Sequence, residues 1–270
     1  MSATPDFVRR YGPTALILGG SEGIGRAFAQ ELAGRGLNLV LVARNPQPLE
    51  EAAAQLRGEH RIEVTVVAQD LTAVDMAAFA TQLLDAHDVG LIVCNAGATH
   101  GVGAFLDAPL GKALGLLQLN CSAPVVFAHQ GLSRRRGRGG GLVVVSSMSG
   151  LVGSGLIATY AAAKAFEIAL CEGLHWELGP QGLDVLCAVA GLTDTPAMRR
   201  SGLSFEAAAK AGYVAMQPAA VARGALERLG QGAVWYAVGE QVATTLQQMP
   251  RPQLTGIMSE ASALMYGNSR

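Results

Sequence analysis

The sequence has few charged residues, 15% of its 270 positions, and few aromatic residues, 5%. Acidic and basic side chains nearly cancel, which leaves a formal net charge of -1. A chain without excess charge of one sign has no general attraction for nucleic acid or for an anionic membrane. The densest basic run, from Arg134 to Arg138, lacks the aromatic side chains on which single-stranded bases stack, so we interpret it as a solvated turn and predict no nucleic-acid partner.

Patterns for metal sites, disulfides and membrane spans are also missing. The five histidines form no metal-ligand group, and the four cysteines are scattered without Cys-x-x-Cys spacing. The first apolar run breaks at Gly19 and Gly20, short of the roughly 18 residues of a membrane span, and no signal-peptide pattern precedes it. We therefore predict no metal, no membrane insertion and a reducing, cytoplasmic location. The cysteines are Cys94, Cys121, Cys171 and Cys187.

Hydrophobic residues, by contrast, make up half of the chain, and many gather in seven short runs. The runs are continuous rather than alternating, which is typical of parallel strands covered on both faces, and segments long enough for helices separate most of them. The pattern predicts a Rossmann-type α/β fold: a doubly wound, seven-stranded parallel sheet with helices on both faces. The predicted strands cover residues 15–18, 37–42, 62–67, 90–94, 142–145, 185–189 and 234–238, and the predicted helices cover 25–34, 48–56, 75–86, 110–132 and 159–178.

Nothing in the sequence divides the chain into separate units. It has no internal repeat and no Pro/Ser-rich linker, so we predict a single domain over residues 1–270. Segment 192–217 differs from its surroundings because it is rich in Ala, Gly and Ser and lies between the sixth predicted strand and the next helix. We interpret this segment as a substrate lid.

A glycine-rich turn follows the first predicted strand and opens directly into a helix. Its sequence, Gly19-Gly20-Ser21-Glu22-Gly23-Ile24-Gly25, has glycines in a G-x-x-x-G-x-G spacing. Glycine lets the backbone approach a ligand closely, and the N–H groups and dipole of a helix N-terminus favour an anion there. With a strand before it and a helix after it, the turn predicts a site for the pyrophosphate of a dinucleotide; the alternative is an ordinary tight turn.

The end of the second predicted strand carries Arg44, where an acidic residue would accept the ribose hydroxyls of NAD. A guanidinium pairs bidentately with a phosphate, whereas an aspartate there would repel one. The position therefore favours NADP(H), with an ordinary surface arginine as the alternative. Glu22 in the glycine turn argues the other way, because a carboxylate is a poor neighbour for a phosphate, so use of NAD(H) stays open.

Tyr160 and Lys164 are four residues apart in a segment rich in helix formers, so both side chains lie on one face of the predicted helix. A nearby ammonium stabilises a phenolate and helps a tyrosine to exchange protons. Such pairs are also common on solvated helices. Ser147 lies thirteen residues before Tyr160, at the end of a buried strand, where open α/β sheets bind ligands; Ser146 and Ser149 are the alternative hydroxyls.

Together, these motifs resemble those of the classical short-chain dehydrogenase/reductase family, over about residues 14 to 198. Gly19, Gly23 and Gly25 match the family's T-G-x-x-x-G-x-G loop, with Leu18 in place of the threonine, and Ala190 replaces the proline of a later Pro-Gly pair. The resemblance implies further cofactor contacts. These are Ser21, Glu22 and Ile24 in the loop, Asp70 and Leu71 at the adenine, Asn95, Ala96 and Gly97 after the fourth strand, and Gly191, Thr193 and Thr195 near the nicotinamide.

The resemblance also implies a catalytic set of four residues, Asn120, Ser147, Tyr160 and Lys164. The interval between Ser147 and Tyr160 is the one found in the family, and Ser147 would polarise the substrate oxygen. Asn120 would hold a water that passes protons to Lys164, and Tyr160 and Lys164 would also contact the cofactor. The resemblance therefore implies hydride transfer between NADP(H) and a carbonyl or secondary alcohol, with Tyr160 as general acid/base.

Apolar side chains near the catalytic segment indicate a small apolar substrate. The alternatives are a dinucleotide-binding regulatory scaffold without turnover, and a dehydratase or epimerase of the same fold. The helices around Asn120 and Tyr160 have small and apolar residues on more than one face, and the resemblance implies that such helices pair across a dimer or tetramer interface. We therefore expect a homodimer or homotetramer; the alternative is that these faces pack only on the sheet. The expected pocket residues are Leu151, Val152, Leu156, Ile157 and Met198, with His100 placed to approach the substrate.

Overall fold

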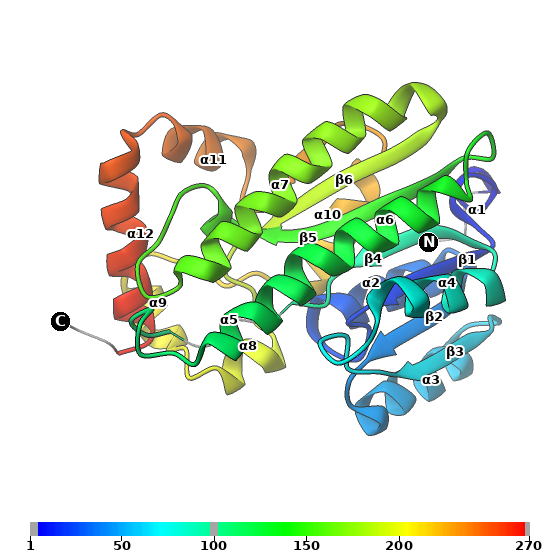
Figure 1. Ribbon diagram of the computed structural model, residues 1–270, viewed down its shortest axis with the longest axis horizontal. Helices are drawn as coiled ribbons and strands as arrows, with labels where there is room; N and C mark the ends of the chain where they lie inside the picture. Colours follow the sequence, from blue (N-terminus) through cyan, green and yellow to red (C-terminus); the bar gives the residue numbers. More distant parts are fainter. Residues whose placement is uncertain (1–4, 98–101, 268–270) are drawn as a thin grey trace.

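The fold is an open sheet of seven parallel strands with helices on both faces (Figure 1). The computed structural model describes residues 5–97 and 102–267. The strand order is β3-β2-β1-β4-β5-β6-β7, so the chain adds strands on one side of β1 and then crosses over to continue on the other. This confirms the predicted fold class. The strands are β1 (Thr14–Leu18), β2 (Asn38–Ala43), β3 (Val64–Ala68), β4 (Val89–Cys94), β5 (Gly140–Ser147), β6 (Leu183–Ala190) and β7 (Val234–Tyr236).

Two layers of helices enclose the sheet. Helices α2, α3 and α10 pack their apolar side chains on one face, and α4, α6 and α7 pack theirs on the other. The helices are α1 (Pro5–Tyr11), α2 (Gly23–Gly34), α3 (Pro46–Glu59), α4 (Met76–Ala86), α5 (Leu110–Leu117), α6 (Ala123–Ser133), α7 (Ala158–Leu178), α8 (Pro196–Arg200), α9 (Phe205–Lys210), α10 (Pro218–Arg228), α11 (Glu240–Gln247) and α12 (Arg251–Met265).

The two cores follow from the alternation of side chains along the central strands. In β1, Ile17 enters one core and Leu16 the other, as the pleat of a strand requires. Phe28 of α2 and Phe127 of α6 are fully buried on these two faces. Because both faces of the strands are covered, the strands need no polar alternation, which explains the continuous apolar runs in the sequence.

The strand order places a crevice between β1 and β4. The chain leaves β1 into α2 on one face and continues after β4 towards α6 on the other. Leu18 pairs with Cys94 at the ends of these two strands, so the segments that follow them lie side by side. A ligand site is expected at such a switch point, outside the carboxyl ends of the strands.

The predicted helix over residues 110–132 is interrupted. A π-helical turn, η1 (Gln118–Ser122), separates α5 from α6, and Ala123 N donates to Gln118 O, five residues back. Pro124 follows immediately and has no N–H to donate, which disfavours a regular helix through this turn. Single π-turns of this kind often occur at functional sites.

Segment 192–217 contains two short helices, α8 and α9, rather than an irregular loop. Its ends are joined by a bridge between Thr193 and Met216, in which Met216 N donates to Leu192 O at 2.8 Å and Asp194 N donates to Met216 O at 2.9 Å. The segment is therefore a closed excursion from the edge of the sheet. Helices α11 and α12, which the sequence patterns did not predict, follow β7, and α12 packs against α9.

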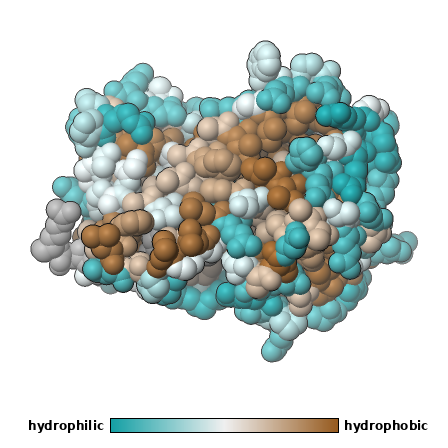
Figure 2. Space-filling model, in the orientation of Figure 1, coloured by the Kyte–Doolittle hydropathy of each residue, from teal (hydrophilic) through white to brown (hydrophobic). Residues whose placement is uncertain are grey.

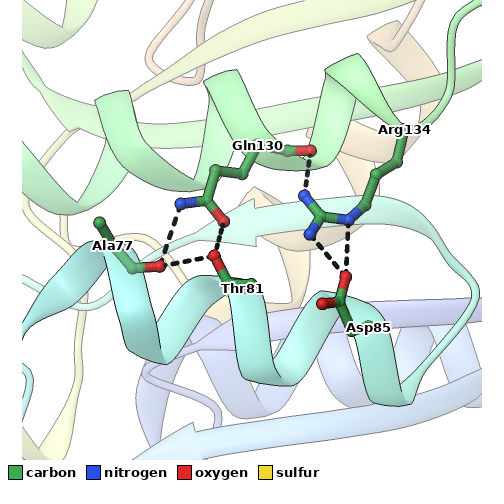
Figure 3. A network of polar contacts seen from close by, with 5 residues as sticks. All are labelled: Ala77, Thr81, Asp85, Gln130 and Arg134. Atoms are coloured by element: carbon green, nitrogen blue, oxygen red, sulfur yellow. Dashed lines mark hydrogen bonds and ion pairs between the residues drawn. The ribbon is translucent and has the colours of Figure 1, made fainter.

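The interface between α4 and α6 explains part of the arginine run (Figure 3). Arg134 Nη2 lies 2.6 Å from Asp85 Oδ1. One turn earlier, Gln130 Nε2 donates to Ala77 O at 3.0 Å, and Thr81 Oγ1 donates to Gln130 Oε1 at 2.9 Å. These contacts tie the solvent side of one helix to the other.

Two further arginines of this run share one carboxylate. Arg135 and Arg138 lie 3.1 and 3.0 Å from the oxygens of Asp88, just before β4, and Arg135 is itself buried. Partnered arginines present less charge to an external polyanion than free ones. The run therefore connects α6 to the edge of the sheet.

The helical stretch Leu110–Ser133 has 24 residues with a mean hydropathy of 1.2, so by length and composition alone it could cross a membrane. Its second half, α6, instead buries Phe127 and Leu132 in the core beside the sheet. We interpret the stretch as a core helix of this fold.

Candidate active site

A cleft of about 650 Å³ lies at the carboxyl ends of the strands, at the switch point between β1 and β4. Most of the predicted cofactor residues line it, together with others that the sequence patterns did not indicate, among them Gln69, Thr72, Lys112 and Arg200. The predicted residues that line the cleft are Gly19, Ser21, Glu22, Gly23, Ile24, Arg44, Asp70, Leu71, Asn95, Ala96, Gly97 and Thr195.

The glycine turn is shaped by close backbone contacts. Gly19 has a φ of 84°, in the left-handed region that favours glycine. Gly25 does not line the cleft but lies beneath the turn, where a Cβ would come within 1.9 Å of Gly19 O and 2.6 Å of Asn95 Nδ2. Asn95 Nδ2 itself donates to Gly19 O at 3.1 Å. The turn after β1 and the segment after β4 are therefore packed as one unit.

Arg44 and Asp70 mark one end of the cleft. Arg44 is exposed, and within the described residues its guanidinium has no ion-pair partner. Asp70 accepts hydrogen bonds from Thr72 N and Thr72 Oγ1 at 2.9 and 2.7 Å. These hydrogen bonds are the main cause of the lowered pKa of Asp70, and the positive charge of Arg44 adds to the effect.

Glu22, the acidic residue of the glycine turn, forms an ion pair with Arg200 of α8. Thr195, at the N-terminus of α8, also contacts this turn, because a Cβ on Gly23 would lie 3.1 Å from Thr195 Cγ2. The carboxylate that argued against a phosphate ligand thus has a cationic partner at the rim of the cleft. Segment 192–217 supplies that partner, and the sequence patterns did not show the contact.

Two predicted cofactor residues, Gly191 and Thr193, lie next to the cleft but do not line it. Thr193 is buried and its hydroxyl donates to Gly191 O at 3.0 Å. A Cβ on Gly191 would lie 2.4 Å from Val238 Cγ1, so the backbone there approaches its neighbour closely. Both residues shape the start of segment 192–217 without lining the cleft.

The predicted catalytic residues converge beside the cleft. Ser147 ends β5, and its Oγ accepts a hydrogen bond from Ser149 N at 3.2 Å. Tyr160 and Lys164 lie one turn apart on α7, with Lys164 Nζ 5.6 Å from the centroid of the Tyr160 ring. Ser146 points elsewhere: its side chain is buried and donates to Lys164 O at 2.8 Å. Of the alternative hydroxyls, Ser146 therefore holds α7 against β5.

Asn120 occupies the π-helical turn η1 and is buried. Its Nδ2 donates to Leu116 O at 2.9 Å. Gly97 lies between Asn120 and the lysine, since a Cβ on Gly97 would be 2.9 Å from Asn120 Oδ1 and 3.5 Å from Lys164 Nζ. The turn thus brings Asn120 to the same place as Lys164.

Glu167 is a buried acidic residue that the sequence patterns did not indicate. Its carboxylate oxygens accept hydrogen bonds from Lys164 Nζ at 2.9 and 3.0 Å. Burial raises the pKa of Glu167 to about 7, although Lys164 and Ser146 act to lower it. The only signal in the sequence is its position three residues after Lys164, on the same helical face.

Helix α12 adds a wall that the sequence patterns also did not predict. Gly155 N donates to Ser259 Oγ at 2.8 Å, and Ser204 N donates to Met265 O at 2.8 Å, so α12 is joined both to the segment before α7 and to segment 192–217. Burial, above all, raises the pKa of Tyr266, with the nearby phenol of Tyr160 adding to it. The end of α12 therefore lies near Tyr160.

The expected substrate residues are distributed unevenly. Ile157 is buried, while Leu151 and Val152 border a separate groove of about 480 Å³ along α7. Leu156 and Met198 are half-buried, on the two segments that flank Tyr160 and the cleft. His100 lies outside the described residues.

Within residues 5–97 and 102–267, no three His, Cys, Asp or Glu side chains are grouped as metal ligands. The four cysteines are free thiols, and all but Cys121 are buried.

Comparison with known proteins identifies the family. The sequence profile described as short chain dehydrogenase matches residues 13–204. A 7beta-hydroxysteroid dehydrogenase of Clostridium sardiniense is 32% identical over 234 residues, 86% of this chain and 88% of that protein. A very-long-chain 3-oxoacyl-CoA reductase-like protein of Arabidopsis thaliana is 32% identical over 254 residues, 87% of this chain and 79% of that protein.

Solved structures agree. A 7beta-hydroxysteroid dehydrogenase has a TM-score of 0.83 at 25% identity, covering 93% of this chain and 98% of its own. A short-chain dehydrogenase from Sphingobium yanoikuyae in complex with NADPH has a TM-score of 0.78 at 30% identity, covering 87% and 91%. With the glycine turn, the Asn-Ala-Gly segment and the Ser-Tyr-Lys arrangement in place, this chain belongs to the short-chain dehydrogenase/reductase family and is an oxidoreductase.

Proposed function

We propose that the protein is an NADP(H)-dependent oxidoreductase that interconverts an apolar ketone and the corresponding secondary alcohol. The observation that carries this proposal is the meeting of Ser147, Tyr160, Lys164 and Asn120 beside the dinucleotide-shaped cleft. A non-catalytic scaffold would not need these four side chains together at the edge of the cleft.

The cleft fits a dinucleotide. Because Gly19 and Gly25 are closely packed and have no side chains, the backbone of the turn faces the cleft directly. Helix α2 begins at Gly23, and its first N–H groups would hold a pyrophosphate. Arg44 would hold a 2'-phosphate at one end, and Tyr160 and Lys164 lie beside the other. When bound, a nicotinamide cofactor supplies or accepts hydride.

The side chains account for the proton that accompanies this transfer. In the reductive direction, the Tyr160 hydroxyl would donate a proton to the carbonyl oxygen, and Ser147 would donate a hydrogen bond to the same oxygen. The ammonium of Lys164 would then stabilise the phenolate left on Tyr160. Asn120 lies next to Lys164, where a water on its side chain would return a proton from solvent. Alcohol oxidation uses the same groups in reverse.

Exposed apolar side chains at the entrance to the site indicate which substrates it prefers. Gly103 N donates to Leu156 O at 3.0 Å, so the segment leading into α5 lies beside the catalytic helix. Phe105 and Leu106 on this segment are 60% and 90% exposed, and Figure 2 shows hydrophobic residues gathered over this segment and α5. A bulky ketone of steroid-like or aromatic type would cover Phe105 and Leu106. The names of two relatives, a hydroxysteroid dehydrogenase and a "bulky-bulky ketone specific alcohol dehydrogenase" from Comamonas testosteroni, support this class.

The proposal is tested by titrating the purified protein with NADPH and NADH by fluorescence and then following a ketone panel at the absorbance of the reduced cofactor. We expect kcat/KM for steroid-like and aromatic ketones to exceed that for small hydrophilic ketones at least tenfold, about 1.4 kcal/mol. Cofactor binding without turnover of any ketone would favour the regulatory scaffold. Product formation without net use of cofactor would favour a dehydratase or epimerase.

Arg44→Asp is expected to weaken NADPH binding by about 10- to 100-fold, because it replaces a charge-assisted hydrogen bond of roughly 1.5–3 kcal/mol by repulsion. NADH affinity should stay the same or improve. Parallel fluorescence titrations measure both, with Arg61→Asp, an exposed arginine away from the cleft, as the matched control. Equal losses for both cofactors would show that Arg44 does not read the 2'-phosphate.

We also propose that the chain forms a homodimer or homotetramer through α5 and α7. Leu110, Leu114 and Leu117 lie on one face of α5 and are 69%, 55% and 38% exposed, and Figure 2 shows a second hydrophobic band along α7. Apolar surface gathered in this way is typical of an interface.

Leu114→Glu is therefore expected to convert the oligomer to a monomer, because it would bury charges at the centre of the interface. Sedimentation at micromolar concentration measures this. Val242→Glu, on α11 and 48% exposed, is the matched control and should leave the assembly unchanged. A monomeric wild-type protein would contradict the proposed interface.

A further inference from the structure

Lys164 and Glu167 form an ion pair that is almost fully withdrawn from solvent. Their side chains are 6% and 3% exposed, and Nζ lies 2.9 Å from Oε1 and 3.0 Å from Oε2. Breaking such a pair by removing one partner leaves an uncompensated charge in a medium of low polarity. The protonation state of Glu167 must therefore affect how readily Lys164 keeps its charge.

The hydrogen bonds of Lys164 also fix its orientation. An ammonium has three N–H donors. Val145 O lies 3.0 Å from Nζ, and the two oxygens of the Glu167 carboxylate lie 2.9 and 3.0 Å from it. These three acceptors fix the orientation of the ammonium.

The ammonium is held beside the groups expected to take part in the reaction. Nζ lies 5.6 Å from the centroid of the Tyr160 ring. Gly97, which lines the cleft, is close enough that a Cβ there would be 3.5 Å from Nζ and 2.9 Å from Asn120 Oδ1. Glu167 and Val145 therefore fix Lys164 within reach of Tyr160 and of the wall of the cleft.

We infer that Glu167 is a positioning residue for the reaction: its buried carboxylate keeps Lys164 protonated and holds the ammonium beside Tyr160 and Asn120. The inference rests on the proposed oxidoreductase activity, but the protonation state of the lysine can be measured without turnover. Glu167 does not line the cleft, so it acts through Lys164.

The charges around the pair support this role. Burial lowers the pKa of Lys164, but the Glu167 carboxylate and, to a smaller extent, Tyr160 outweigh it, so the net shift is upward. At Glu167, burial raises the pKa more than the charge of Lys164 lowers it, so the pKa of Glu167 is about 7. The other groups that act on Glu167 are the Ser146 hydroxyl and the thiols of Cys94, Cys121 and Cys171, whose raised pKa values keep them uncharged near neutral pH.

The rate of reduction should therefore depend on pH. Below about pH 7, Glu167 takes up a proton, and the buried ammonium loses its counter-charge. The protonated carboxyl no longer offers the ammonium a charged acceptor, so Lys164 is held less firmly in the orientation that stabilises a phenolate on Tyr160. Reductive kcat should therefore fall as the pH decreases through about 7, and the fall should depend on Glu167.

The direct test is NMR of protein labelled with ¹³Cε-lysine. The chain has only three lysines, and Lys112 and Lys210 are exposed, so they serve as internal references. The Lys164 signal is assigned by its loss in Lys164→Met. In the wild-type protein it should show a step near pH 7 from Glu167 and otherwise remain that of an ammonium. In Glu167→Gln, Lys164 should lose its proton at a lower pH than Lys112 and Lys210.

The kinetic test compares Glu167→Gln with Glu177→Gln, an exposed glutamate on the same helix. At saturating cofactor and pH 8, we expect kcat to fall at least tenfold for Glu167→Gln and to stay within twofold for Glu177→Gln. The fall of wild-type kcat below pH 7 should be absent from the Glu167→Gln profile. Glu167→Asp keeps the charge, so it should recover part of kcat and retain the pH-dependent fall.

The outcomes separate this inference from the proposed function. Wild-type turnover with an unchanged kcat and pH profile in Glu167→Gln would overturn the inference alone, as would an unmoved Lys164 titration. No turnover of any ketone by the wild-type protein would remove the proposed function, while the lysine titration would still decide the role of Glu167. If Glu167→Gln does not fold, a Glu167→Asp variant with wild-type kcat and an unshifted pH profile would overturn the inference.

Discussion

Tyr160→Phe is expected to lower kcat at least about 10³-fold while changing cofactor affinity only slightly, because it removes the hydroxyl that exchanges the proton and keeps the ring. The ring can stay in place, since its position near Lys164 on α7 depends on packing rather than on the hydroxyl. Ketone reduction at the absorbance of the reduced cofactor and fluorescence titration of the cofactor measure the two quantities separately.

Tyr236→Phe is the matched control for this change. It removes a buried hydroxyl that accepts a hydrogen bond from Gln247 Nε2 at 2.8 Å, at the edge of the sheet and away from the catalytic set. We expect about 1 kcal/mol of lost stability and unchanged kcat. A Tyr160→Phe variant that keeps more than a tenth of wild-type kcat would show that another group donates the proton.

Gly25→Ala is expected to weaken dinucleotide binding at least about 100-fold. The added Cβ would lie 1.9 Å from Gly19 O and 2.6 Å from Asn95 Nδ2, which no side-chain rotation can relieve, because the closest contact is with backbone. The turn would have to move, and the loss of two charge-assisted hydrogen bonds to the pyrophosphate, each worth roughly 1.5 kcal/mol or more, gives this magnitude. Fluorescence titration with NADPH measures it.

Gly58→Ala distinguishes this local effect from a general effect of replacing glycine. Gly58 lies within α3, and a Cβ there would meet nothing within 4 Å. Alanine should stabilise the helix by about 1 kcal/mol and leave cofactor binding unchanged. A Gly25→Ala protein that binds NADPH within fivefold of wild type would show that the turn yields without losing its contacts.

Local patterns in the sequence were enough to predict the sheet and to select the residues that we propose as catalytic. Continuous apolar runs are characteristic of strands buried on both faces, and the spacing from Tyr160 to Lys164 places both side chains on one helical face whatever the rest of the chain does. Ser147 could be placed at the carboxyl edge because β5 ends there. These features depend on neighbours in the chain, so the sequence shows them directly.

The short C-terminal elements were less accessible. Helices α8, α9 and α11 have eight residues or fewer, and packing rather than intrinsic propensity stabilises helices of this length. Their apolar faces are too short to give a clear period. Consequently, the helical content of segment 192–217 did not appear in the sequence patterns.

The sequence by itself determined the family, the doubly wound parallel sheet, and the choice of Asn120, Ser147, Tyr160 and Lys164 as the expected catalytic set. Only the tertiary structure decided that Arg200 partners Glu22, from 178 positions away, and that Glu167 lies buried beside Lys164. The physical reason is that charge compensation depends on distance and burial. When the two charged residues come from different elements, their separation along the chain determines neither the distance between them nor their burial. When they lie on one helix, the separation does not show which face of the helix is buried.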